Sequence, residues 1–273
     1  MKTTLVVLGF LISSSAFAEP TQQQLEDRAK ELETKLAGRG FTILVEAPFV
    51  VVGDAPNTKK IATGFLRDKR TLLEKDFFGK RPDKLLEVWL FKNEKDFRKG
   101  AHEFFKDPPD TPFGYYSPDE NALVMNANGL GTLSHELVHP YMEANFPGVP
   151  AWFNEGLASL FEYPSERKGH IIGLVNWRLP GLKAEIKHDT LPTLGKLLAT
   201  STDEFYNAQW DAYAQARYLV YYLQEHDLLH AFFTKFQAAT DDKTGIATLE
   251  SVLGEDLATF EPKWRKWVMA LHQ

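Results

Sequence analysis

Two histidines lie four positions apart in the stretch TLSHELVHP, residues 132–140, and a glutamate directly follows the first of them. Four residues of an α-helix turn through about 400°, so His135 and His139 would share one face and both imidazoles could reach a single ion. Glu136 borders that face, where its carboxylate can accept a proton from a water molecule. A catalytic zinc site needs three protein ligands. The stretch therefore predicts two ligands and a general base, and the third ligand must come from another segment.

Three arrangements of the third ligand can be compared with the chain. A metzincin site would need a glycine and a histidine at positions 142 and 145, where the chain has Met142 and Asn145. The inverted order His-x-x-Glu-His is absent. The remaining arrangement takes a glutamate from a following helix, and Glu155 in the stretch AWFNEGLASLFE, residues 151–162, supplies one.

The residues around Glu155 add a resemblance to a known group. The stretch WFNEGLAS, with Glu162 beyond it, resembles the second metal-binding helix of gluzincin metallopeptidases, which follows a His-Glu-x-x-His motif and provides the third ligand. The resemblance implies Zn²⁺ bound by His135, His139 and Glu155, with Glu136 as the general base. It covers roughly residues 85–236.

The chain differs from the zinc aminopeptidases of this group in two ways. Fifteen residues separate His139 from Glu155, a shorter interval than in the zinc aminopeptidases of the group. The Gly-x-Met-Glu-Asn segment with which those enzymes bind a free amino terminus is missing upstream. The chain is therefore more similar to the peptidase MA-like family of small exported bacterial proteins.

A third segment, YAQARYLVYYL at residues 213–223, is similar to the helix that carries a catalytic tyrosine in gluzincins. The matching residue is Tyr213, which would donate a hydrogen bond to the oxyanion of the tetrahedral intermediate. A tyrosine buried in the core is the alternative. Other tyrosines compete for the same role, namely Tyr206, Tyr218, Tyr221 and Tyr222.

Composition excludes several other kinds of chemistry. The chain has 273 residues, 44% of them hydrophobic, and a formal net charge of −6 without a basic block. A nucleic-acid partner would need a face rich in Lys and Arg, so none is expected. Cysteine is absent, which excludes disulfides, thiolate nucleophiles and cysteine-bound metal.

The first eighteen residues predict a cleavable export signal. Lys2 supplies a positive charge, residues 5–12 are apolar, and Ala16-Phe17-Ala18 has the small-x-small pattern of a cleavage site. The apolar run is too short to span a bilayer, and no later run approaches that length. We therefore expect cleavage after Ala18, a periplasmic or secreted protein, and no membrane span in the mature chain.

Hydrophobic periodicity predicts an α+β fold in one domain, residues 19–273. It comprises an α/β portion with a small mixed sheet (19–112), a hairpin and the zinc helices (113–163), and a mainly helical portion (164–273). Strands are expected at residues 41–45, 49–52 and 85–91 and in a hairpin at 113–125. Helices are expected at residues 21–38, 57–78 and 93–105, and beyond residue 150 with breaks at Pro164, Pro180-Gly181 and Pro192.

Some features allow two interpretations. Residues 121–126 are expected either as an edge strand beside the zinc helix, to which an extended peptide could add, or as an interior strand. For Asn154 and Ser159 we favour a helix cap and a small packing residue over support of a ligand. His226 and His230 repeat the spacing of the first pair, but no completing helix follows, so an exposed helix face is expected.

Together these features predict an exported zinc-dependent metallopeptidase that acts on a peptide or protein substrate. Its general base would be Glu136. Two alternatives remain: a zinc-binding interaction module without activity, and a zinc amidase that acts on cell-wall peptide. The sequence does not predict the oligomeric state.

Overall fold

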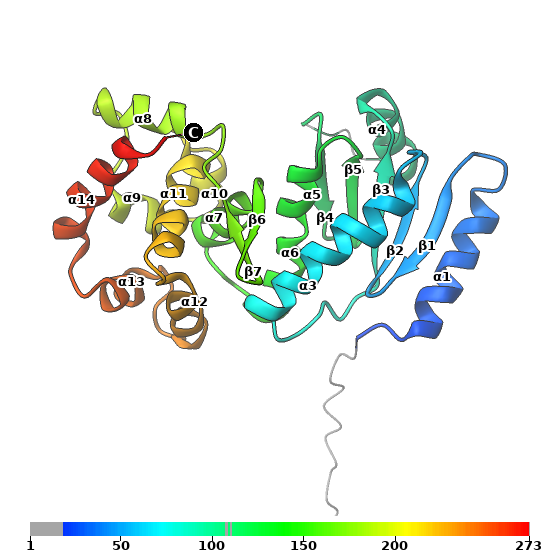
Figure 1. Ribbon diagram of the computed structural model, residues 1–273, viewed down its shortest axis with the longest axis horizontal. Helices are drawn as coiled ribbons and strands as arrows, with labels where there is room; N and C mark the ends of the chain where they lie inside the picture. The colour runs from blue at the N-terminus through cyan, green and yellow to red at the C-terminus, as the bar shows by residue number, and fades with distance from the viewer. Residues whose placement is uncertain (1–18, 107–108, 110, 273) are drawn as a thin grey trace, which may run out of the picture.

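The computed structural model describes residues 19–106, 109 and 111–272, and the predicted export signal lies outside this range. Over the described residues an α+β fold is confirmed (Figure 1). The strands are β1 Thr42–Glu46, β2 Phe49–Gly53, β3 Leu86–Phe91, β4 Gly114–Ser117, β5 Ala122–Asn126, β6 Pro164–Arg167 and β7 His170–Gly173. The helices before the site are α1 Gln22–Lys35, α2 Thr58–Lys60, the π-helical η1 Ile61–Leu66, α3 Arg67–Asp76, α4 Glu94–Gly100 and the π-helical η2 Ala101–Phe105.

The five-stranded sheet has the order β1-β2-β3-β5-β4. Its inner pairs β2–β3 and β3–β5 are parallel, whereas β1–β2 and β4–β5 are antiparallel hairpins. Strand β5 is therefore interior, and the edge next to the site belongs to β4. The edge position considered for residues 121–126 is wrong, because both sides of β5 are paired.

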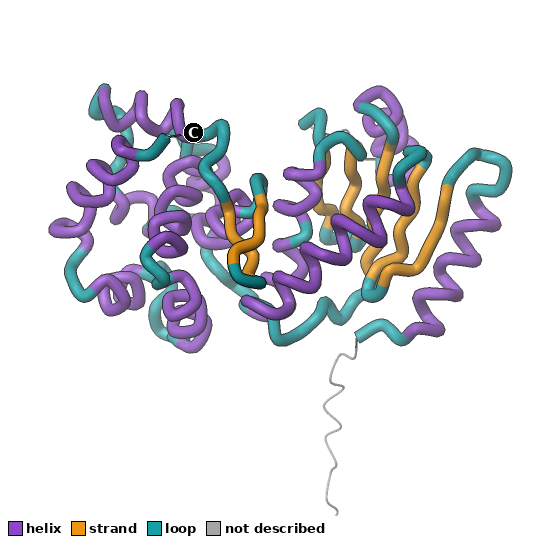
Figure 2. Tube along the Cα trace, in the orientation of Figure 1, coloured by secondary structure: helices purple, strands orange, loops and turns teal. Residues whose placement is uncertain are grey.

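Alternation along the strands gives the sheet two buried faces, since successive side chains of a strand point to opposite sides. Val50 and Trp89 lie in a core shared with α1 and α4, whereas Val51 and Val88 lie in a core shared with α3. This second core continues into the carboxyl-terminal half as far as Val268. Figure 2 shows helices on both sides of the sheet.

The site helices and the carboxyl-terminal half follow β5. They are α5 Leu130–Glu136, α6 Val138–Asn145, α7 Ala151–Leu160, α8 Leu179–Lys187, α9 Leu194–Leu198, α10 Thr202–Tyr206, α11 Ala212–Glu225, α12 Leu229–Ala238, α13 Ile246–Leu253 and α14 Leu257–Ala270. None of the helices in the described ranges is long and apolar enough to cross a membrane.

The structure at two of the predicted helix breaks is more specific than a simple interruption of a helix. Pro164 begins the small β6–β7 hairpin, which the sequence analysis missed. Pro180 and Gly181 do not interrupt a helix, because they lie in the first turn of α8. Proline is tolerated there, since the amide that it lacks would have no partner within the helix.

Candidate metal centre

The stretch that carries the two histidines spans two consecutive helices. His135 and Glu136 end α5, and His139 lies in the first turn of α6, with Leu137 between them in right-handed helical conformation. Pro140 lacks the amide that would bond to the carbonyl of Glu136, which explains why the regular helix is interrupted here. The chain nevertheless keeps its helical course, so the two imidazoles remain on one side as predicted.

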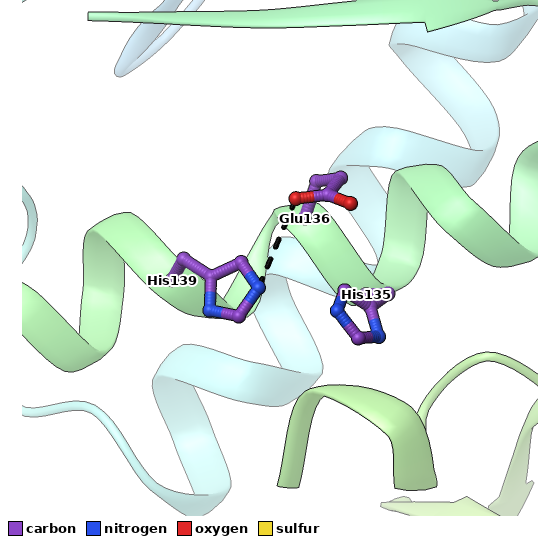
Figure 3. Close-up of side chains that lie close together, drawn as sticks. All are labelled: His135, Glu136 and His139. Atoms are coloured by element: carbon purple, nitrogen blue, oxygen red, sulfur yellow. Dashed lines mark ion pairs between the residues drawn. The ribbon is translucent and has the colours of Figure 1, made fainter. Parts of the chain in front are cut away.

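The three side chains converge, as Figure 3 shows. Donor atoms of His135, Glu136 and His139 lie within 4.8 Å of one another. The imidazole rings are 5.0 Å apart between centroids, and Nε2 of His139 is 3.7 Å from Oε2 of Glu136. A cluster of the predicted residue types that could hold a metal ion is therefore present.

Glu155 reaches the same histidines from α7. Its Oε2 atom is 3.2 Å from Nε2 of His135 and 3.9 Å from Nε2 of His139. The carboxylate is buried, and Oε2 faces both imidazoles. Burial raises the pKa of Glu155, but the two histidines outweigh this effect and lower the pKa to about 2. A buried anionic oxygen that faces two imidazole nitrogens fits a divalent cation, because a buried charge is costly without a partner of opposite charge.

Close packing places α7 against α11. A Cβ atom on Gly156 would lie 3.0 Å from a methyl group of Val220 and 3.1 Å from the carbonyl oxygen of Ala216. The glycine next to Glu155 therefore allows the two helices to approach each other. This close contact between α7 and α11 helps to position Glu155, the residue before Gly156.

Asn154 does not cap a helix, contrary to our preferred interpretation. The residue before α7 is Pro150, and Asn154 instead places Oδ1 3.1 Å from Nδ1 of His139. This contact orients the imidazole with Nε2 toward the cluster. Ser159 is buried and its hydroxyl has no partner among the described residues, which agrees with a small residue at a close contact.

His135 is supported on its other side by Glu162. The Oε1 atom of Glu162 is 3.5 Å from Nδ1 of His135. Arg178 donates two hydrogen bonds to this carboxylate, at 2.9 and 2.7 Å, and Asn176 donates a third at 3.0 Å. Burial raises the pKa of Glu162, whereas Arg178 and His135 lower it to about 2. Glu162 is thus an anchored anion behind the imidazole.

Without a metal ion, the proton on His135 balances this negative charge. Burial lowers its pKa, but the hydrogen bonds with Glu155 and Glu162 outweigh that effect and raise the pKa to about 10. A metal ligand must be deprotonated, so a bound cation would take the place of this proton.

Glu136 lies against the exposed edge of the sheet. The backbone amide of Tyr116 in β4 donates a hydrogen bond to its Oε2 at 3.1 Å. Burial raises the pKa of Glu136, and the two histidines oppose this shift. A carboxylate with a raised pKa is a better proton acceptor at neutral pH than an exposed one.

Two cavities meet at the cluster, and His135, Glu136 and Tyr213 line both. The Trp177 cavity has a volume of about 770 Å³ and includes Trp177, Arg178, Phe113 and Gly129. The Phe146 cavity has a volume of about 670 Å³ and includes Phe146, Tyr116, Glu143 and Tyr206. The cluster therefore borders both cavities, and we refer to the two together as the cleft.

Two tyrosines lie at the site, Tyr213 in both cavities and Tyr206 in contact with Glu155. Tyr213 on α11 lines both cavities, and burial raises its pKa. Tyr206 on α10 donates a 2.6 Å hydrogen bond to Oε1 of Glu155. Burial, followed by Glu155, raises the pKa of Tyr206 as well. Tyr213 thus remains a candidate for binding an oxyanion, and Tyr206 holds the proposed third ligand.

Sequence reasoning missed the roles of Tyr206, Asn176 and Arg178. They lie 51 residues after Glu155 and 14 and 16 residues after Glu162, respectively. No local spacing connects them to the metal cluster. Only the approach of α10 and of the segment before α8 reveals the contacts.

The second pair of histidines does not form a cluster of this kind. His226 contacts the carbonyl of Tyr222 through Nδ1 at 2.9 Å, and its ring stacks on that tyrosine. His230 stacks on Phe77 with 4.6 Å between the ring centroids. Within the described part of the chain, the cluster of His135, Glu136 and His139 is the group with metal-site geometry.

Part of the chain is similar to a known protein family. Residues 130–244 match a family described as a protein of unknown function, DUF1570. The match begins at α5 and includes the three helices α5, α6 and α7, Glu162, Arg178 and both candidate tyrosines. The chain matches no curated protein.

Proposed function

We propose that the protein is an exported zinc-dependent metallopeptidase that hydrolyses peptide bonds. The observation that carries the proposal is the buried Oε2 atom of Glu155, which faces Nε2 of both histidines. Two imidazoles and one carboxylate are a ligand set typical of catalytic zinc. A purely structural zinc site would use four protein ligands, and it would have no need of a buried glutamate beside the cluster.

Each residue of the cluster has a distinct proposed role. His135, His139 and Glu155 would hold the cation, which when bound would act as a Lewis acid and make water easier to ionise. Glu136 accepts the proton of the attacking water and passes it to the amine nitrogen as the carbon–nitrogen bond breaks. The hydroxyl of Tyr213 donates a hydrogen bond to the oxygen of the former carbonyl, where negative charge develops.

The base role of Glu136 is tested with the Glu136→Gln variant. We expect the variant to retain zinc and to lose at least about a hundredfold in kcat/KM on peptides, because proton transfer by a positioned base contributes about 10²–10⁴-fold. Zinc content is measured by elemental analysis and hydrolysis by mass spectrometry. Glu120→Gln in the exposed turn before β5 is the matched control. Unchanged hydrolysis by zinc-loaded Glu136→Gln would refute the mechanism.

The ligand role of Glu155 is separated from that of Glu136 by zinc content. Glu136 is also close enough to the histidines to bind an ion. However, its Oε2 accepts a hydrogen bond from the Tyr116 amide, whereas Oε2 of Glu155 faces Nε2 of both histidines. We therefore expect Glu155→Ala to lose zinc. A native protein that binds zinc but cuts no peptide would indicate an interaction module, and release of cell-wall peptide from sacculi would indicate an amidase.

A further inference from the structure

The exposed aromatic side chains concentrate along the cleft. In the described part of the chain, the large hydrophobic residues with substantial exposure are Phe113, Tyr163, Trp177, Tyr206 and Met269. Phe113 and Trp177 line the Trp177 cavity, and Tyr206 lines the Phe146 cavity. Exposed aromatic groups around a concave site indicate a surface that binds apolar groups.

Trp177 is held in place although its side chain faces solvent. It is 67% exposed, but both of its sequence neighbours, Asn176 and Arg178, donate hydrogen bonds to Glu162. The guanidinium of Arg178 also lies 4.3 Å from the centroid of the indole ring. A rigid aromatic group loses little conformational entropy on binding, which is why such residues dominate recognition sites.

Cavities border the metal cluster on two sides, one lined by Trp177 and the other by Phe146. A peptidase that removes terminal residues needs one side closed, or a free charge that binds the terminal amine or carboxylate. Arg178, the cation of the Trp177 cavity, is engaged with Glu162 and lies 3.8 Å from Asp211. Glu143 in the Phe146 cavity accepts a hydrogen bond from the hydroxyl of Tyr116. Among the described residues, the Trp177 cavity therefore presents no unpaired cation for a terminal carboxylate, whereas Glu143 keeps its negative charge in the Phe146 cavity.

The open edge of β4 runs along this cleft. Gly114 lines the Trp177 cavity, and Tyr115 and Tyr116 line the Phe146 cavity. The amide of Tyr116 points away from β5, since it bonds to Glu136. Gly114 has a partner on this side, because its amide donates to the hydroxyl of Thr111 and its carbonyl accepts from it. The carbonyl of Tyr116 can accept a hydrogen bond from an extended peptide, which would then pass directly beside the general base.

On these grounds, and resting on the proposed function, we propose that the protein cuts within polypeptide chains. An extended internal segment lies across the metal cluster along β4. A large apolar side chain next to the scissile bond enters the Trp177 cavity and contacts Trp177 and Phe113. These two residues determine specificity.

The test uses zinc-loaded protein and nonapeptides with an acetylated amino terminus and an amidated carboxyl terminus. The central residue is Phe, Leu, Ala or Asp. We expect internal cleavage, with kcat/KM for Phe at least about tenfold above that for Ala, since burial of an aromatic side chain favours binding by that factor or more. In Trp177→Ala the Phe-to-Ala ratio should fall by about tenfold. Tyr163→Ala is the matched control, because Tyr163 is an exposed aromatic residue that lines neither cavity.

A second measurement separates this inference from the proposed function. Binding of the same peptides to the Glu136→Gln variant is followed by fluorescence polarisation, with and without Trp177→Ala. If no peptide is cut but the Phe peptide binds more tightly and depends on Trp177, the peptidase function fails and the binding site stands. Cleavage that requires a free terminus would overturn the inference while the peptidase function stands. A Phe-to-Ala ratio unchanged in Trp177→Ala would overturn it in the same way.

Discussion

His135 is the residue on which most of the site depends, because carboxylates contact both of its ring nitrogens. Glu155 faces Nε2 at 3.2 Å, and Glu162 lies 3.5 Å from Nδ1. The second contact selects the ring orientation that directs Nε2 toward the cluster. Partners behind a metal-binding histidine commonly affect metal affinity strongly although they never touch the ion.

Replacement of Glu162 should therefore weaken zinc binding. We expect Glu162→Gln to reduce zinc affinity by about ten- to a hundredfold, the usual cost of losing such a partner. The neutral amide removes the negative charge behind His135 and leaves Arg178 without its carboxylate. Affinity is measured by competition with a chromogenic chelator. Glu166→Gln on β6, an exposed position, is the control. Equal affinities in the two variants would show that Glu162 does not support the ligand.

At the scale of elements, one contact joins the metal-site helices to the helix that covers the sheet. Tyr141 on α6 donates a 2.6 Å hydrogen bond to Glu74 on α3. Arg81 donates two more to the same carboxylate, at 2.8 and 3.0 Å. Burial raises the pKa of Glu74, but these hydrogen bonds outweigh it and lower the pKa overall.

Loss of this carboxylate should reduce stability in a manner that depends on pH. We expect Glu74→Gln to lower the free energy of unfolding at pH 7 by about 1–2 kcal/mol, less than for a fully buried ionic hydrogen bond because the side chain is partly in water. A carboxyl with a lowered pKa stabilises the fold above its unfolded pKa of about 4.3 and loses that effect as pH falls through the folded pKa.

The free energies of unfolding of native protein and Glu74→Gln should therefore become more similar as the pH falls. Urea denaturation at several pH values measures this difference. The control is Glu94→Gln, which removes an exposed pair with Arg98 one helical turn away. A difference between native protein and Glu74→Gln that stays constant from pH 7 to below the folded pKa would contradict the assignment.

At the scale of the whole molecule, a single core joins the sheet to the carboxyl-terminal helices. Phe78 follows α3 and is 2% exposed. Its ring lies 5.4 Å from Tyr141 and 5.9 Å from Phe233 on α12, measured between centroids. We therefore expect the portions divided at residues 112 and 163 to unfold together, since each would expose apolar surface without the others.

Truncation of Phe78 should consequently destabilise both halves together. We expect Phe78→Ala to reduce the free energy of unfolding by about 3–5 kcal/mol, as for other buried phenylalanines. Unfolding followed by tryptophan fluorescence and by far-ultraviolet circular dichroism should remain one coincident transition. Phe113→Ala, at a position that is 53% exposed, should change stability little. Two separate transitions in the native protein would show that the halves fold independently.

Local patterns in the sequence predicted most of the elements and the centre of the site. Alternating or continuous apolar residues predicted the strands, and the hairpin at residues 114–126 lies where its turn residues indicated. Helical spacing brought His135, Glu136 and His139 together, because that geometry is set within about one turn of backbone. The β6–β7 hairpin was missed because its strands have only four residues each, too few to show a clear alternation.

The sequence by itself therefore determined the fold class and the metal-binding pair with its neighbouring glutamate, since all of these follow from short-range geometry. Only the tertiary structure decided which strand forms the edge beside Glu136, that Asn154 orients His139, and that Tyr206 contacts Glu155. It also decided that Glu162 and Arg178 hold His135 and Trp177 in place. These contacts join segments that are distant in the chain, and their distances depend on how helices pack, which residue spacing does not specify. The close approach of Gly131 to the carbonyl of Glu162, where a Cβ atom would lie 2.3 Å from the oxygen, has the same origin.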